Sequence, residues 1–94
     1  MKEKPMGVIM EEMPVGKVEK FFGKIGVAAI KVTAGELKVG DRIKIKGHST
    51  DFEQTVDSMQ VEHATVQTAA AGDEVGIKVK EKVHENDLVY VMRE

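Results

Sequence analysis

The sequence predicts an all-β fold, a small closed six-stranded β-barrel of the Greek-key type, and three observations support this prediction. Apolar residues recur at every second position through most of residues 15–92, which is the pattern of strands with one buried face. Glycine-bearing turns separate these runs at short intervals. No stretch has the 3.6-residue apolar spacing of a long amphipathic helix. Closure into a barrel is expected because it removes the sheet edges that several short strands would otherwise expose.

The chain is expected to hold one domain preceded by an arm. Residues 1–13 have mixed charge and few apolar side chains and are interpreted as an N-terminal arm, whereas residues 14–94 are assigned to the barrel. The barrel begins with two alternating runs, residues 15–22 and 27–32, which predict two strands. Between them the segment GKIG, residues 23–26, carries the glycines that a tight turn needs. The first two strands are therefore expected to form a hairpin.

A third strand is expected at residues 42–46, RIKIK, after the turn residues Gly35 and Gly40. Glycine reaches positive φ at little steric cost, so these two positions suit sharp reversals of the chain. Within the strand, Ile43 and Ile45 alternate with basic residues. One face is therefore predicted to be buried and the other to be cationic.

Three more strands are expected, at residues 52–62, from residue 75 onward, and at residues 88–92. The apolar phase slips within the first of them, because Val56 and Met59 are three positions apart, and we expect a β-bulge at residues 57–58 to absorb the extra residue. The predicted core consists of inward positions of the first five strands: Val18, Val27, Val32, Ile43, Ile45, Val56, Met59, Val61, Val75, Ile77 and Val79.

Composition narrows the classes of function. The chain has 94 residues and a formal net charge of -2, so it lacks the overall basicity of a dedicated nucleic-acid binder, and any such binding would need a local patch. It has no cysteine, which excludes a disulfide framework and a thiolate nucleophile. No apolar run is long enough to cross a bilayer. Without cysteines or a signal-peptide apolar core, the sequence predicts a cytoplasmic protein that does not enter a membrane.

Basic residues occupy outward positions of the predicted strands, and we take seven of them as candidate partner-binding residues. They are Lys31, Arg42, Lys44, Lys46, Lys78, Lys80 and Lys82. Such a face could hold an anionic partner, structured RNA being the expected one, or it could be the solvated outer face of a sheet. The solvated face is favoured if nearby carboxylates lie between the basic residues, because charges of opposite sign cancel the electric field of a surface. These carboxylates belong to Glu53, Asp57, Glu62, Glu74 and Glu81.

Side chains suited to catalysis or metal binding are few. His48, His63 and His84 lie at predicted turns, without a His-x-x-x-His spacing, a cysteine or a nearby acidic pair, so we expect no metal site. Residues 49–51, Ser-Thr-Asp, follow His48, but adjacent loop residues do not reach the geometry of a catalytic triad. We therefore expect no catalytic residue, no cofactor and no enzyme activity.

Two adjacent aromatic residues leave one further alternative open. Phe21 and Phe22 must point to opposite faces of the first strand, so one ring is expected to face outward beside Lys20 and Lys24. That ring could form a stacking platform for a base, or it could pack at the edge of the core.

Three segments, in order, resemble a known family. They are GKIGVAAIKVTAGELKVGDRIKI (residues 23–45), TVDSMQVEH (55–63) and AAAGDEVGIKV (69–79). They are similar to the second domain of translational GTPases such as elongation factor Tu and initiation factor two, and this resemblance, over roughly residues 15–92, implies a translation-protein β-barrel. No GxxxxGK[ST] loop is present, so no GTP binding is expected. The last segment, VHENDLVYV (83–91), resembles the barrel that ends certain collagenase-like peptidases, which is an accessory domain without catalytic residues.

Two classes of function therefore stay open. The resemblance to translational GTPases favours a stand-alone, translation-factor-like binding module, in which the seven basic residues contact RNA or the ribosome. The alternative is a protein-docking accessory module for a separately encoded peptidase or GTPase.

Overall fold

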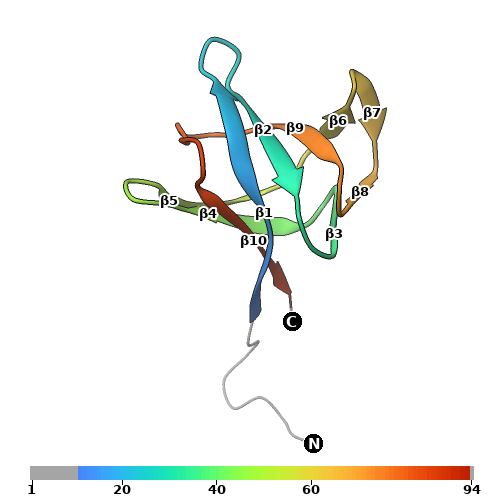
Figure 1. Ribbon diagram of the computed structural model, residues 1–94, viewed down its shortest axis with the longest axis horizontal. Helices are drawn as coiled ribbons and strands as arrows, with labels where there is room; N and C mark the ends of the chain where they lie inside the picture. The colour runs from blue at the N-terminus through green and yellow to red at the C-terminus, as the bar shows by residue number, and fades with distance from the viewer. Residues whose placement is uncertain (1–10, 94) are drawn as a thin grey trace, which may run out of the picture.

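The computed structural model describes residues 11–93, and in this part of the chain the predicted all-β fold is confirmed (Figure 1). No helix among the described residues is long and apolar enough to span a membrane. Ten strands form within residues 11–93: β1 (Glu11–Phe22), β2 (Val27–Val32), β3 (Glu36–Lys38), β4 (Arg42–Lys46), β5 (Asp51–Thr55), β6 (Met59–Val61), β7 (Ala64–Val66), β8 (Thr68–Ala70), β9 (Glu74–Lys78) and β10 (Leu88–Arg93).

Eight of these strands form one sheet in the order β5-β4-β10-β1-β2-β9-β6-β7, and β3 pairs separately with β8. The pairings are antiparallel. β1 is the longest strand, with 12 residues, and its register shifts twice, after Pro14 and after Val18. Such bulges bend a strand and increase its twist. The bent β1 pairs with β10 along its first part and with β2 along its second part, which forms the expected hairpin.

The core is built from the alternating inward positions of the strands, as predicted. Among the predicted core residues, Val61 is half-buried and packs against the core, and the others except Val27 are buried. The assignment of Val27 to the core is wrong, because Ala28, Ile30 and Val32 are the inward residues of β2 and Val27 lies half-buried on its other face. The buried apolar residues are Val15, Val18, Ala28, Ile30, Val32, Leu37, Ile43, Ile45, Phe52, Val56, Met59, Ala69, Val75, Ile77, Val79, Val83, Val89 and Val91. The predicted turn glycines Gly35 and Gly40 have φ values of 63° and 97°. Residues that carry a Cβ atom rarely adopt such positive φ values.

The expected boundary between arm and barrel differs from the structure. Residues 1–10 of the predicted arm lie outside the described residues. Glu11, Glu12 and Met13 belong to β1 and pair with the last residues of β10, Arg93 among them. These three residues extend the sheet because β10 continues to Arg93 and offers its backbone groups to them.

The predicted bulge at residues 57–58 is wrong. β5 ends at Thr55 and β6 begins at Met59, and the two strands pair with different neighbours, β5 with β4 and β6 with β9 and β7. The segment between them crosses from one part of the sheet to another. Val56 in this segment is buried in the core, and its backbone N–H donates to the carbonyl oxygen of Asp41. The phase slip in the sequence therefore marks a change of pairing partner.

A buried glutamine links the end strand β5 to the segment that follows β9. The Nε2 of Gln54 donates to the carbonyl oxygen of Lys78 at 2.8 Å, and its Oε1 accepts from the backbone N–H of Lys80 at 2.9 Å. The side-chain amide thus makes the pair of hydrogen bonds that a neighbouring strand would make. The sequence holds a signal for this role, because Gln54 occupies an inward position between Phe52 and Val56.

Replacing Gln54 by Leu is expected to lower the free energy of unfolding by about 1–3 kcal/mol, because it leaves two backbone groups without their partners. Urea unfolding followed by circular dichroism measures this change. The exposed Gln60, changed to Leu, serves as the control and should have little effect. Equal stability of the two variants would show that the Gln54 bridge contributes nothing.

Candidate functional site

The structure brings three of the seven predicted partner-binding residues to one hollow and separates the other four. Arg42, Lys78 and Lys80 line a hollow of about 410 Å³ where β5 meets the end of β9, and its other lining residues are Gln54, Thr55, Asp57 and Val79. We name this the basic hollow. Its lining holds three cations and one carboxylate, and the charge stays positive when the Glu53 carboxylate beside Arg42 is counted as well.

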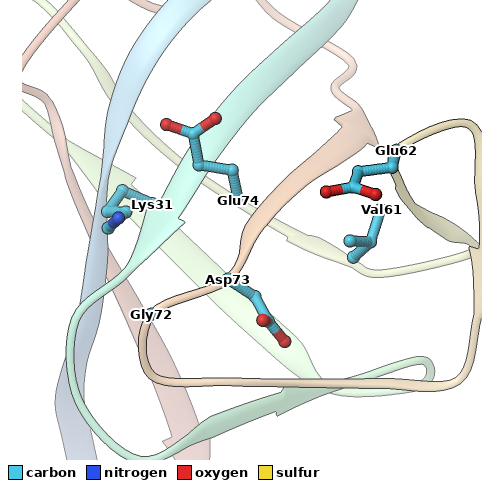
Figure 2. Close-up of a pocket in the computed structure, with 6 residues that line it drawn as sticks. All are labelled: Lys31, Val61, Glu62, Gly72, Asp73 and Glu74. Carbon is cyan, nitrogen blue, oxygen red and sulfur yellow. The ribbon is translucent and has the colours of Figure 1, made fainter.

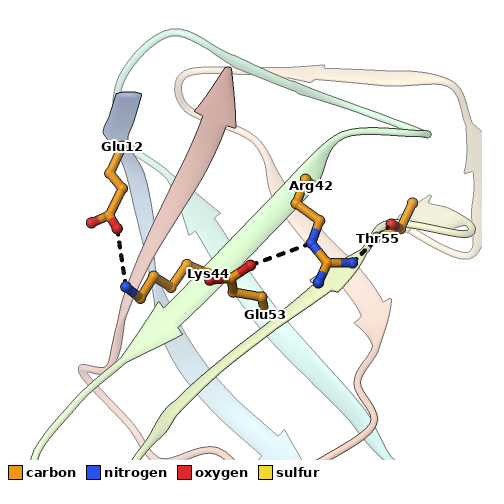
Figure 3. Close-up of polar contacts among 5 residues, drawn as sticks. All are labelled: Glu12, Arg42, Lys44, Glu53 and Thr55. Atoms are coloured by element: carbon orange, nitrogen blue, oxygen red, sulfur yellow. Dashed lines mark hydrogen bonds and ion pairs between the residues drawn. The ribbon is translucent and has the colours of Figure 1, made fainter. Parts of the chain in front are cut away.

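Two of the seven residues form ion pairs on the outer face of the sheet (Figure 3). Lys44 reaches across β10 from β4, and its Nζ lies 3.0 Å from Oε2 of Glu12 on β1. The hydrogen bond from Lys44 to Glu12 raises the pKa of the ammonium group above its ordinary value. The Nε of Arg42 lies 3.5 Å from Oε1 of Glu53, and its Nη1 donates to Oγ1 of Thr55, also at 3.5 Å.

Lys31 lies in a different environment, which Figure 2 shows in detail. It lines a second hollow of about 410 Å³ together with Val61, Glu62, Gly72, Asp73 and Glu74. We name this the acidic hollow, because its lining holds three carboxylates and one ammonium group. The Asp73 carboxylate also accepts a hydrogen bond from the backbone N–H of Ala70, so it holds the turn before β9.

The last two candidates lie apart from both hollows. Lys46 ends β4, where Asp51 and Leu88 are its neighbours on the adjacent strands. Lys82 is exposed in the segment between β9 and β10. The seven residues therefore do not form a single cationic surface, and Glu12, Glu53 and the carboxylates of the acidic hollow interleave with them. Glu12 was assigned to the arm from the sequence, so its pairing with Lys44 was not foreseen.

A threonine, a histidine and an aspartate meet where the turn between β4 and β5 contacts the turn before β10. Oγ1 of Thr50 lies 3.1 Å from Nδ1 of His84, and the same ring nitrogen lies 3.8 Å from Oδ2 of Asp87. A catalytic triad needs the hydroxyl and the carboxylate on opposite ring nitrogens, so this group lacks that geometry. Thr50 is also only 3% exposed, and Asp87 accepts the backbone N–H of His84 at 2.8 Å. The group holds the two turns together.

Within residues 11–93, no group of three histidine, cysteine, aspartate or glutamate side chains is arranged to hold an ion.

Exposed apolar side chains mark a further surface at the β1–β2 hairpin. Phe21 is half-buried and packs against the core, so Phe22 is the outward ring, at 42% exposure. The Nζ of Lys20 lies 5.4 Å from the centre of that ring. Ile25, in the turn, is 60% exposed. The sequence had marked Phe22 as one of two candidates for an outward ring, but Ile25 was treated only as a turn residue.

Comparison with protein families decides the assignment of the chain. The family described as elongation factor Tu domain 2 matches residues 26–89. The chain belongs to the elongation factor Tu domain 2 family. The resemblance noted in the sequence is thereby confirmed, and the match spans β2 to the beginning of β10.

The relatives that match most of this chain carry the names of peptidases. An uncharacterized protease of Methanocaldococcus jannaschii is 39% identical over 84 residues, which are 88% of this chain and 20% of the protease. A collagenase of Porphyromonas gingivalis is 39% identical over 85 residues, covering 89% of this chain and 20% of the collagenase. The chain thus spans about one fifth of the length of these relatives.

A solved structure has the same fold. The C-terminal domain of a putative U32 peptidase from Geobacillus thermoleovorans superimposes with a TM-score of 0.77, over 85% of this chain and 91% of that domain, at 19% sequence identity. Both resemblances inferred from the sequence, to elongation factor Tu domain 2 and to the terminal barrel of collagenase-like peptidases, are confirmed.

The preferred functional prediction is wrong. A translation-factor-like module that contacts RNA or the ribosome was expected, yet the relatives of this elongation factor Tu domain 2 chain are a protease and collagenases. The error has a physical origin, because the resemblance to translational GTPases concerned the fold, and a fold carries no information on the partner. The alternative, an accessory module for a peptidase, agrees better with these relatives.

Proposed function

We propose that this chain is a non-catalytic accessory module that docks to a peptidase domain. The observation that carries the proposal is the extent of the match: nearly nine tenths of this chain aligns with a protease of which it covers only one fifth. A segment of that size within a longer protease can form a domain of its own. The rest of the protease chain is then the nearest surface to which this domain can dock. A cytoplasmic location, predicted from the cysteine-free sequence, is part of the proposal.

The geometry of the described residues supports a binding role. Both larger hollows are open depressions on the surface, and the Thr50, His84 and Asp87 group lacks the arrangement of a triad. We also propose that the six strands of five or more residues close into the family's barrel, with Gln54 joining β5 to the end of β9. A barrel braced in this way is a rigid support for surface residues.

The basic residues enter the proposal as contacts for a protein. Arg42, Lys78 and Lys80 of the basic hollow are positioned to receive carboxylates from the peptidase domain. Arg42 already has a carboxylate partner in Glu53, so Lys78 and Lys80 are the residues from which we expect the larger contribution. Lys31, Lys44, Lys46 and Lys82 are placed on other parts of the surface and have a smaller expected role.

A peptidase assay tests whether the module is non-catalytic. The purified chain should release no more fluorescence from labelled gelatin than a buffer blank does, with the Porphyromonas gingivalis collagenase as the positive control. Hydrolysis that elutes with the chain in gel filtration, and that disappears in Thr50→Ala or His84→Ala variants, would contradict the proposal.

A further inference from the structure

The tip of the β1–β2 hairpin places two large apolar side chains next to each other in solvent. The backbone N–H groups of Ile25 and Gly26 both donate to the carbonyl oxygen of Phe22, at 3.2 and 2.9 Å, and Gly26 ends the turn with a φ of 66°. These bonds form a single turn of helical type, in which positions three apart lie on the same side. Phe22 and Ile25 therefore lie on one side of this turn. The connection between β1 and β2 projects from the body of the fold (Figure 1).

This apolar tip continues onto the outer face of the sheet at the start of β2. Phe22 pairs with Val27 across the hairpin, and Val27 is half-buried with an outward side chain. Turns are normally polar, so 60% exposure of Ile25 and 42% exposure of Phe22 in one turn expose apolar surface that the fold itself does not use. We name Phe22, Ile25 and Val27 the hairpin tip.

Lysines surround the hairpin tip. Lys20 lies over the Phe22 ring, and Lys24 is exposed within the turn. The end of β9 and the residue after it lie beside the hairpin. Lys78 pairs with Val27, and the backbone N–H of Val79 donates to the carbonyl oxygen of Gly26 at 2.9 Å. Lys78 and Lys80 of the basic hollow therefore lie on either side of a residue that contacts the hairpin.

We infer that the hairpin tip is the element by which the module docks, and that the peptidase domain receives it in an apolar pocket rimmed by carboxylates. This inference rests on the proposed function. The relatives carry the matching segment on chains about five times its length, so a peptidase domain is the surface available to cover it. An aromatic ring and an isoleucine at the centre of a contact, with charges at its rim, is the usual arrangement of a stable protein interface.

The lysines around the hairpin tip indicate which charges the rim of the partner's pocket carries. Residues 17–27 contain three lysines and one glutamate, and Lys78 and Lys80 add to the same side. Carboxylates around the pocket would pair with these lysines and orient the hairpin, whereas a cationic rim would repel it.

Hydrogen exchange locates the docking surface. The protein to use is the Methanocaldococcus jannaschii protease in which this chain replaces the matching 84-residue segment, compared with this chain alone. We expect the amides of residues 22–27 and 78–80 to exchange up to about 100-fold more slowly in the chimera, because a docked surface is exposed to solvent less often.

Paired variants separate the hairpin tip from other exposed apolar residues. Phe22→Ser combined with Ile25→Ser should abolish the added protection, and Ile25→Lys alone, at a 60% exposed position, should do the same without disturbing the fold. The matched control is Leu88→Ser, because Leu88 is 45% exposed on β10, and it should leave the protection unchanged. Melting of each free variant verifies that it is folded.

The outcomes are distinct. Protection that appears elsewhere on the module and is unaffected by the tip variants would overturn this inference and leave the proposed function intact. No protection anywhere in the chimera would contradict both. Dimerisation of the free chain that Ile25→Lys abolishes would identify a second copy of the chain, and not a peptidase domain, as the occupant of the hairpin tip.

Discussion

Replacing Ile45 by Ala is expected to lower the free energy of unfolding by about 2–4 kcal/mol. Ile45 lies on β4 between β5 and β10 and has no exposed surface. The loss combines the transfer free energy of the removed methyl and methylene groups with the cost of the cavity that they leave. Ile77→Ala on β9, at 1% exposure, should cost a similar amount.

Ile25→Ala is the matched control for these two variants. It removes the same atoms from a side chain that is 60% exposed, so the free energy of unfolding should change by less than about 0.5 kcal/mol. Urea titrations of all three variants measure the differences. Changes below about half a kcal/mol at both Ile45 and Ile77 would contradict the core described here.

Gly16→Ala is expected to be the other strongly destabilising change, at about 3 kcal/mol. Gly16 pairs with Val32 on β2, at the point where the register of β1 shifts. A Cβ atom built at Gly16 would overlap the backbone carbonyl oxygen of Lys31. A backbone group within a sheet cannot move aside as a flexible side chain can, so the β1–β2 ladder would have to separate locally.

Gly23→Ala tests whether this effect comes from the close approach or from losing a glycine. The Cβ atom at Gly23 would lie 3.6 Å from the Phe21 ring, an ordinary contact. Its stability should be unchanged or raised by up to about 1 kcal/mol, since alanine restricts the unfolded chain. Thermal unfolding of both variants provides the measurement, and equal destabilisation would refute the steric explanation.

Alternation and turn glycines were sufficient to predict most of the fold. Ile43, Ile45, Val75 and Ile77 are buried because strand geometry places every second side chain on one face. The split between β5 and β6 was missed, because a phase slip has the same appearance in a sequence whether the strand bulges or changes its neighbour. The short strands β3 and β8 were not predicted, because three residues are too few to show an alternating pattern.

The candidate site was harder to predict. Outward positions for Arg42, Lys44 and Lys46 follow from alternation, but their partners depend on which strands are adjacent. Glu12 meets Lys44 only because β1 lies one strand beyond β10. The exposure of Ile25 depends on the conformation of a turn, and turn residues follow no period. The choice between an RNA and a peptidase partner depended on relatives, since the family fold accommodates both.

Differential scanning calorimetry of the Methanocaldococcus jannaschii chimera tests the docking proposal most directly, by comparing the melting of the module with that of the free chain. A tethered module faces its partner at an effective concentration near the millimolar range. If the dissociation constant is about 100-fold lower, docking adds about 2.7 kcal/mol to the stability of the module. For a domain of this size, the Tm of the module should then rise by about 10 °C or more. A module that melts in the chimera within about 2 °C of the free chain would be independent of the peptidase domain, which would contradict the proposal.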